Sequence, residues 1–203
     1  MEKIQDALKN FEVLPYSETY KILSENVNAK GQKGVLYVFA GPNGSGKSTL
    51  IASLYKQGKL KGIKYVGAEV FARMKFKEIK PREKRLDMSN EFIFELSNDI
   101  IKKHDSVVLE TSITKQTKLD LIKKFKQNGY HVISFFLSPN YTDINIERVA
   151  KRVREGGYNF SKEELYTQFE ISNLNKNSLF KTSDEFYEID TSRKPKILEN
   201  LYK

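Results

Sequence analysis

The stretch Gly41-Pro42-Asn43-Gly44-Ser45-Gly46-Lys47-Ser48-Thr49 fits the pattern G-x-x-x-x-G-K-[ST] and decides the fold. An apolar run, residues 35–40, comes before it, and a segment of helical period, residues 48–56, comes after it. Three glycines let consecutive backbone N–H groups converge on phosphate oxygens, and the start of a helix adds its positive dipole. We therefore predict a phosphate-binding loop in which all nine residues contact a nucleotide.

Two side chains of this loop carry more specific expectations. Lys47 should reach the β- and γ-phosphates of a nucleoside triphosphate, and the Ser48 hydroxyl should take one position on Mg²⁺. The sequence thus predicts ATP and Mg²⁺ as ligands. A glycine-rich hairpin is the structural alternative, and the strand and helix on either side argue against it.

The rest of the chain alternates short apolar runs with longer helical segments, which is typical of an α/β fold with a largely parallel sheet flanked by helices. We expect strands at residues 64–68, 106–110, 131–137 and 186–189, and helices at residues 90–104, 115–128, 142–154, 161–179 and from Pro195 onward. Together with the loop, this order predicts a P-loop NTPase fold. Two glycines at positions 156 and 157 follow residues 142–154 and make that helix a candidate lid.

The first 34 residues are predicted to form a helical N-terminal extension that packs on a main domain, residues 35–203. The 203 residues suffice for one domain of ordinary size, and the formal net charge of +9 favours anionic partners without choosing one. The chain has no cysteine, which excludes disulfides, thiolate metal sites and a cysteine nucleophile. No apolar run approaches ~18 residues, so we expect no membrane segment and a cytoplasmic protein.

Two acids lie at the expected ends of strands, where ligands bind in open α/β sheets. Glu69 follows the run 64–68, and Glu110 closes the run 106–110 with Thr111 next to it. A kinase needs one carboxylate to accept the proton of the attacking hydroxyl, and a second often holds the acceptor or the water shell of the metal. The alternative for Glu69 is an exposed position in a loop.

Arg148 and Arg152 are four residues apart and share one face of the predicted lid helix. Such a pair suits a lid that closes over a triphosphate and neutralises charge in the transition state, although a solvated basic face is the alternative. Two other polar stretches are expected to be structural. The basic run at residues 73–85 should be solvated, with steering of an anionic substrate or nucleic acid as the alternative. Residues 190–192 should cap the last helix, with contact to the nucleotide base as the alternative.

Taken in chain order, these elements resemble the zeta-toxin family of P-loop kinases over residues 35–193. The resemblance is carried by AGPNGSGKST at 40–49, VGAEVFA at 66–72, LETS at 109–112, GYHVISFFLSP at 129–139, ERVAKRVREGGYN at 147–159 and FYEIDTS at 186–192. The segment 147–159 is the most specific, because R-V-x-x-R-V-x-x-G-G is not a general feature of P-loop proteins.

This resemblance implies a kinase that moves the γ-phosphoryl group of ATP to a hydroxyl of UDP-N-acetylglucosamine or a similar nucleotide sugar. It implies that Glu69 stands at the position of the base and Arg152 at that of the lid arginine, with Arg148 in support. Glu110 and Thr111 stand where the family holds the sugar substrate. It also implies a small antitoxin protein as a partner.

The chain departs from the family's pattern at three positions. Glu69 replaces an aspartate base, Tyr158 replaces a histidine, and Gln168 lies where a run of arginines is common. A displaced base and a missing arginine both slow transfer. The second hypothesis is therefore an ATP-binding module with weakened catalysis that acts through a protein partner. The third is a polynucleotide kinase or other nucleic-acid ATPase, which the net charge and the run 73–85 alone favour, so nucleic acid is not the expected partner.

Overall fold

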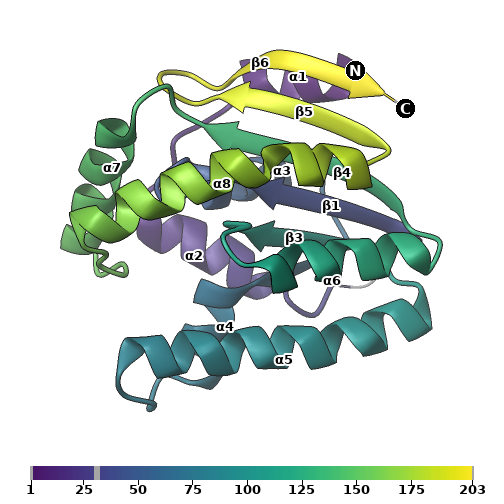
Figure 1. The fold of residues 1–203 in the computed structure, drawn as a ribbon, viewed down its shortest axis with the longest axis horizontal. Coiled ribbons are helices and arrows are strands. Elements are labelled where there is room, and N and C mark those ends of the chain that lie inside the picture. Colours follow the sequence, from purple (N-terminus) through teal and green to yellow (C-terminus); the bar gives the residue numbers. More distant parts are fainter. Residues whose placement is uncertain (1, 30–32, 203) are drawn as a thin grey trace.

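The computed structural model describes residues 2–29 and 33–202, and Figure 1 shows how they are arranged. Residues 30–32, in the predicted link between the extension and the main domain, lie outside the described residues. The elements in chain order are α1 (Glu2–Lys9), α2 (Tyr16–Glu25), β1 (Val35–Ala40), α3 (Lys47–Lys56), β2 (Lys64–Gly67), α4 (Ala68–Lys75), α5 (Arg82–Lys103), β3 (Val107–Thr111), α6 (Gln116–Gln127), β4 (His131–Ser138), α7 (Thr142–Arg154), α8 (Lys162–Thr182), β5 (Glu185–Asp190) and β6 (Lys196–Tyr202).

The strands form one sheet in the order β2-β3-β1-β4-β5-β6. The strands β1 to β5 are parallel, and β6 pairs antiparallel with β5 at the edge, so the predicted largely parallel sheet is confirmed. β1 lies between β3 and β4 and is covered on both faces, which explains its unbroken apolar run. Later strands of the chain, β3 and β4, flank β1 on its two sides. In such folds this arrangement leaves a crevice at the carboxyl end of the central strand, where ligands bind.

Helices cover both faces of the sheet. Figure 1 shows α6 and α8 across one face and α2 and α3 behind it. The predicted extension packs on the rest of the chain, because α2 lies against α3 and α4, and Ala7, Leu14 and Leu23 join the same apolar core as the strands. Within that core the rings of Phe39 and Phe135 stack with their centroids 4.7 Å apart. The domain boundary after residue 34 stays a prediction.

The C-terminal segment differs from the expectation, because Lys196–Tyr202 is the strand β6 and not a helix. Pro195 is a frequent helix start, but the segment is short and its backbone completes the sheet by pairing with β5. Ile197 packs against the core from this strand. A short helix is marginal by itself, whereas an edge strand gains the hydrogen bonds of an existing ladder.

The segment between β2 and β3 is more helical than predicted. α4 begins directly after β2, and α5 begins at Arg82 instead of residue 90, with Pro81 as its N-cap. Charged side chains at the start of α5 obscure the apolar period that would reveal it. Two consequences matter for the site. Glu69 is the second residue of a helix and not a loop residue, and the basic run 73–85 spans the end of α4 and the start of α5.

Candidate active site

The phosphate loop, residues 41–49, connects β1 to α3 and is shaped by glycine. Gly41 and Gly44 have φ angles of 136° and 81°, in the left-handed region. A Cβ atom on Gly41 would lie 2.0 Å from the carbonyl oxygen of Leu137, and one on Gly44 would lie 2.7 Å from that of Asn145. Both glycines are therefore required for conformation and for space.

Lys47 is the first residue of α3, and its side chain is almost completely buried. Its Nζ donates hydrogen bonds to the carbonyl oxygens of Gly41 and Pro42, at 2.9 and 2.8 Å. Burial lowers the pKa of Lys47 to about 8, and the nearby charge of Glu110 opposes that shift. The Ser45 hydroxyl, also buried in the loop, has no hydrogen-bond partner among the described residues. The loop thus offers a buried cation and a buried hydroxyl to a phosphate group.

Glu110, at the carboxyl end of β3, is fixed by two hydroxyl groups. The Ser48 hydroxyl donates to its Oε1 and the Tyr65 hydroxyl to its Oε2, each at 2.7 Å. Burial raises the pKa of Tyr65 well above its usual range, and the charge of Glu110 raises it further, so Tyr65 stays a hydrogen-bond donor. The predicted acid is therefore held against the phosphate loop. Tyr65, which orients it, has no local sequence signal that would have identified it.

Glu69, on α4, joins the N-terminal extension to α7. Its Oε1 accepts a hydrogen bond from the Tyr16 hydroxyl at 3.1 Å, and its Oε2 lies 3.3 Å from Nη1 of Arg152. Burial raises the pKa of Tyr16 above its usual value, and the carboxylate of Glu69 raises it further. Nη2 of Arg152 donates to the carbonyl oxygen of Tyr158 at 3.3 Å. The predicted base and the predicted lid arginine therefore form an ion pair.

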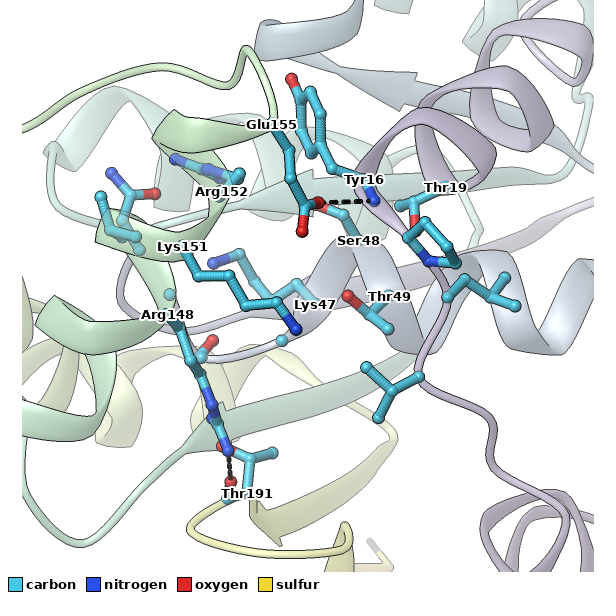
Figure 2. A pocket seen from close by; sticks show the side chains of 18 of the residues that line it. Tyr16, Thr19, Lys47, Ser48, Thr49, Arg148, Lys151, Arg152, Glu155 and Thr191 are labelled. Atoms are coloured by element: carbon cyan, nitrogen blue, oxygen red, sulfur yellow. Dashed lines mark hydrogen bonds between the residues drawn. The ribbon is translucent and has the colours of Figure 1, made fainter.

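Tyr16 was not identified from the sequence, because the contact between Tyr16 and Glu69 joins residues 53 positions apart. A second bond fixes the start of α2, since the backbone N–H of Tyr16 donates to Oε2 of Glu155 at 3.1 Å, drawn in Figure 2. The N-terminal extension therefore contacts the predicted base, Glu69, and Glu155, the residue directly after the predicted lid helix α7.

Arg148 lies on the same face of α7 as Arg152, and Figure 2 shows both beside the cavity above the phosphate loop. Nη2 of Arg148 donates to the carbonyl oxygen of Thr191. Burial lowers the pKa of Arg148, and the charge of Asp190 opposes that shift. Residues 190–192 therefore lie at the carboxyl end of β5, where Thr191 lines the cavity, and the prediction that they cap a final helix is wrong.

Two departures from the family's pattern have partners in the structure. Oε1 of Gln168 accepts a hydrogen bond from Nδ2 of Asn43, at 2.5 Å, so α8 contacts the phosphate loop through an amide. The ring of Tyr158 is buried among arginines from the run 73–85. The expectation that this run is simply solvated is wrong for Arg73, Arg82 and Arg85, which are half-buried.

These groups surround a cavity of about 480 Å³, within the ~300–1,000 Å³ of small-molecule sites (Figure 2). Its wall includes residues 43–49, Glu69, Glu110, Arg148 and Arg152. The N-terminal extension closes another side with residues 11, 13–16 and 19. Thr111 does not line this cavity. It is buried at the end of β3, where its Oγ1 accepts a hydrogen bond from the backbone N–H of Ile113.

The fold and the loop together define a P-loop nucleotide-binding protein. The chain belongs to the family whose model is described as ABC transporter, which matches residues 24–179. That match contains the phosphate loop, both acids and α7. No helix in residues 2–29 or 33–202 is long and apolar enough to cross a membrane.

An uncharacterized protein of Haemophilus influenzae is 28% identical over 127 residues, which are 63% of this chain and 86% of that protein. A chain of the AvrRxo1-ORF1:ORF2 complex with ATP has a TM-score of 0.67 and 15% identity, over 99% of this chain. This chain spans 66% of the length of that one. A chain of the PezAT toxin-antitoxin system of Streptococcus pneumoniae has a TM-score of 0.64 and 13% identity, over 92% of this chain and 81% of that one. At these identities the likeness shows a shared fold, and the predicted P-loop fold is confirmed.

Proposed function

We propose that this protein is an ATP-dependent phosphotransferase that resembles zeta toxins. The observation that carries the proposal is the convergence of Lys47, Glu69 and Arg152 at one cavity beyond the carboxyl end of β1. The charges of Glu69 and Arg152 are close enough to act on the pKa of Lys47. A phosphate clamp, a base and a second cation are the parts that phosphoryl transfer requires.

In the proposed step, a hydroxyl oxygen of the acceptor attacks the γ-phosphorus of ATP. The bond from that phosphorus to the oxygen bridging the β- and γ-phosphates breaks, and ADP leaves with the electron pair. The Glu69 carboxylate takes the proton of the hydroxyl, while Lys47, Arg148 and Arg152 neutralise the charge on the transferring group. Because Tyr16 donates to Glu69, the acceptor hydroxyl has to displace Tyr16 from that carboxylate.

The Ser48 hydroxyl and the Glu110 carboxylate fit a magnesium ion. Oγ of Ser48 and Oε1 of Glu110 lie 2.7 Å apart beside the phosphate loop. Oxygen atoms of these kinds are the ligands that Mg²⁺ prefers. These two groups would hold Mg²⁺, Ser48 by direct contact and Glu110 through the water shell. When bound, the ion would neutralise charge on the phosphate oxygens.

As acceptor we propose a nucleotide sugar such as UDP-N-acetylglucosamine. Glu110 lines the cavity at a position that holds the sugar in the family. Thr111, at the next such position, is buried away from the cavity and has no contact with the acceptor in this proposal. The proposal is tested by incubating the protein with ATP, Mg²⁺ and UDP-N-acetylglucosamine, and separately with a metabolite extract, followed by mass spectrometry. We expect a product 80 mass units heavier than its acceptor, the mass of one added phosphoryl group, with the wild type and not with Lys47→Ala. ATP binding without any phosphorylated product in either mixture would contradict the proposal.

An ATP-binding module with weakened catalysis is the second candidate, and one observation favours it. Gln168 makes an amide contact with Asn43 where an arginine would act on phosphate, so one cation of the family's site is absent from that position. The variant Glu69→Asp separates the two candidates. It should raise the rate of a working kinase whose base is one methylene too long, and it should leave a binding module without activity.

We further propose a small inhibitory protein as partner, in the cytoplasm. The solved structures with a similar fold support this, since the names of two of them describe a complex and a toxin-antitoxin system. Expression of the wild type in a bacterial host should arrest growth, whereas Lys47→Ala should not. Equal growth of the two cultures at equal protein levels would contradict a toxin-like activity.

A further inference from the structure

Three arginines from the basic run, Arg73, Arg82 and Arg85, gather around one aromatic ring. Their guanidinium carbons lie 4.9, 5.5 and 5.4 Å from the ring centroid of Tyr158. Arg82 also lies 4.0 Å from the ring centroid of Phe160. We refer to these three residues as the arginine cluster. The ring faces offset part of the positive charge, because cations are attracted to the aromatic quadrupole.

None of the three arginines of the cluster forms an ion pair with another of the described residues, although the carboxylate of Glu69 lies near enough to act on Tyr158 together with Arg73. Each donates a hydrogen bond to a backbone carbonyl oxygen, Arg73 to Gly156, Arg82 to Asn159 and Arg85 to Lys77. The Nε atom of each arginine is buried and has no hydrogen-bond partner in the described part of the chain. Three partly buried like charges without an ion-pair partner favour the binding of an anion by their terminal guanidinium nitrogens.

The start of α5 strengthens the same positive region. Arg82 is the first residue of this 22-residue helix and Arg85 lies in its first turn, where the helix dipole favours anions. Pro81, the N-cap, provides no side-chain hydrogen bond to the helix. Figure 1 places the link from α4 to α5 on the same side of the molecule as the link from α7 to α8, which holds Tyr158 and Phe160.

The arginine cluster lies near Tyr16 and Glu69, on the side of the candidate active site where we place the acceptor substrate. Arg73 is four residues after Glu69 on α4, and its guanidinium stacks at 5.1 Å on the ring of Tyr16, the residue that bonds to Glu69. Burial raises the pKa of Tyr158, the charges of Arg85 and Arg73 oppose that shift, and the charge of Glu69 adds to it, so these groups lie near the same ring. None of the three arginines lines the cavity above the phosphate loop, whereas Glu69 does.

We propose that the arginine cluster binds phosphate groups of the acceptor substrate, a phosphorylated small molecule such as a pyrophosphate ester. The inference rests on the proposed function and adds to it a specificity subsite made by Arg73, Arg82 and Arg85. The reacting hydroxyl of the acceptor would lie at Glu69 while its phosphate groups lie on the guanidinium groups. Arginine suits this role, because its planar donor fork matches phosphate oxygens in pairs.

The experiment measures binding of inorganic pyrophosphate to the full chain by calorimetry, with the phosphate loop saturated by magnesium and a non-hydrolysable ATP analogue. We expect one further pyrophosphate to bind to the wild type. Arg82→Gln and Arg85→Gln should each weaken that binding about tenfold, as expected for the loss of one charge-assisted contact. Lys84→Gln removes an equal charge from an exposed position on the same helix turn and should leave the affinity within about twofold.

Arg82 also donates a hydrogen bond to the carbonyl oxygen of Asn159, so Arg82→Gln can loosen the link between α7 and α8. The Arg85 side chain donates a hydrogen bond to the carbonyl oxygen of Lys77 and to no residue of the link among the described residues, and Arg85→Gln therefore separates anion binding from support of that link. Thermal unfolding of each variant shows whether the fold is retained. Equal affinities of Arg85→Gln and Lys84→Gln for pyrophosphate would overturn the proposal, and so would absence of pyrophosphate binding to the wild type.

Pyrophosphate binding requires no phosphoryl transfer, so the experiment can succeed or fail independently of the proposed kinase activity. A phosphorylated oligonucleotide is the alternative ligand of a basic surface. If it bound through the same arginines at physiological salt while pyrophosphate did not, the assignment to a small molecule would be wrong.

Discussion

The two sides of the cavity are constructed differently. On the phosphate side, nine consecutive residues are shaped by the backbone, and a Cβ atom on Gly41 or Gly44 would collide with neighbouring backbone. On the acceptor side, Tyr16, Glu69 and Arg152 come from three separate helices and are joined by side-chain contacts of 3.1 and 3.3 Å. Each such bond contributes ~1 kcal/mol net. The phosphate side should therefore tolerate almost no change, whereas the acceptor side should adjust in small steps.

The largest expected effect is that of Lys47→Ala. It removes the buried cation of the phosphate loop and should lower phosphoryl transfer by at least ~1,000-fold, because charge stabilisation in a water-excluded site is worth several kcal/mol. Transfer measured with saturating ATP checks this. Lys59→Ala, at an exposed position beyond α3, is the matched control and should retain the wild-type rate. A residual rate above one hundredth of the wild type would contradict the role of Lys47.

This contrast also explains what could be read from the sequence. The phosphate loop, β1 and α7 were predicted because their signals are local: fixed glycine spacing, one apolar run and one amphipathic period. Tyr16 and Tyr65 were not predicted, because they meet Glu69 and Glu110 only through the tertiary fold. No spacing along the chain encodes such contacts.

The errors have a similar origin. The charges of the run 73–85 predict a solvated segment. The run itself does not indicate that the α7–α8 link brings the ring of Tyr158 against its arginines. The sequence predicts a helix where β6 lies, because the pairing with β5 that decides the conformation of this segment is not encoded in its own residues. Propensity is a weak guide where a neighbouring strand supplies the hydrogen bonds.

Two glycine substitutions in the phosphate loop separate the effect of steric overlap from the effect of backbone conformation. Gly41→Ala should destabilise the fold by at least ~3 kcal/mol, because its Cβ would lie 2.0 Å from a backbone oxygen in addition to the unfavourable φ angle. Gly46→Ala should cost ~1–2 kcal/mol, since its φ is 90° but no atom lies within 4 Å of the added Cβ. Urea unfolding of both variants measures the two losses. Equal losses would mean that backbone conformation alone, and not space, restricts the loop.

The pH dependence of nucleotide binding tests the buried lysine. Because the pKa of Lys47 is lowered to about 8, the free protein loses this charge as the pH rises above 8, whereas a bound triphosphate favours the charged form. Below pH 8, the contribution of Lys47 to the affinity for a magnesium complex of an ATP analogue should be constant. Above pH 8, the affinity should fall by up to tenfold for each pH unit. Lys47→Arg keeps its charge at these pH values and should remove the dependence. Calorimetry between pH 7 and 9.5 gives the answer, and an unchanged affinity of the wild type up to pH 9.5 would rule the mechanism out.

The smallest expected effect belongs to the acceptor side. Tyr16→Phe removes the hydrogen bond to Glu69 and keeps the ring on which Arg73 stacks. If the acceptor hydroxyl has to displace the Tyr16 hydroxyl from the carboxylate, its loss should raise kcat/KM for the acceptor two- to tenfold, the range of one net hydrogen bond. The affinity for ATP should not change, because Tyr16 does not contact residues 41–49 by any hydrogen bond in the described chain.

The matched control for this variant is Tyr20→Phe. Tyr20 also presents its ring to Arg73, at 5.5 Å, and lies one helical turn further along α2 without a hydrogen bond to Glu69. Tyr20→Phe should therefore leave kcat/KM unchanged. A fall in kcat/KM with Tyr16→Phe would reverse the interpretation, because the hydroxyl would then orient the base for the reaction instead of competing with the substrate. The N-terminal extension would in that case complete the acceptor side of the cavity instead of obstructing it.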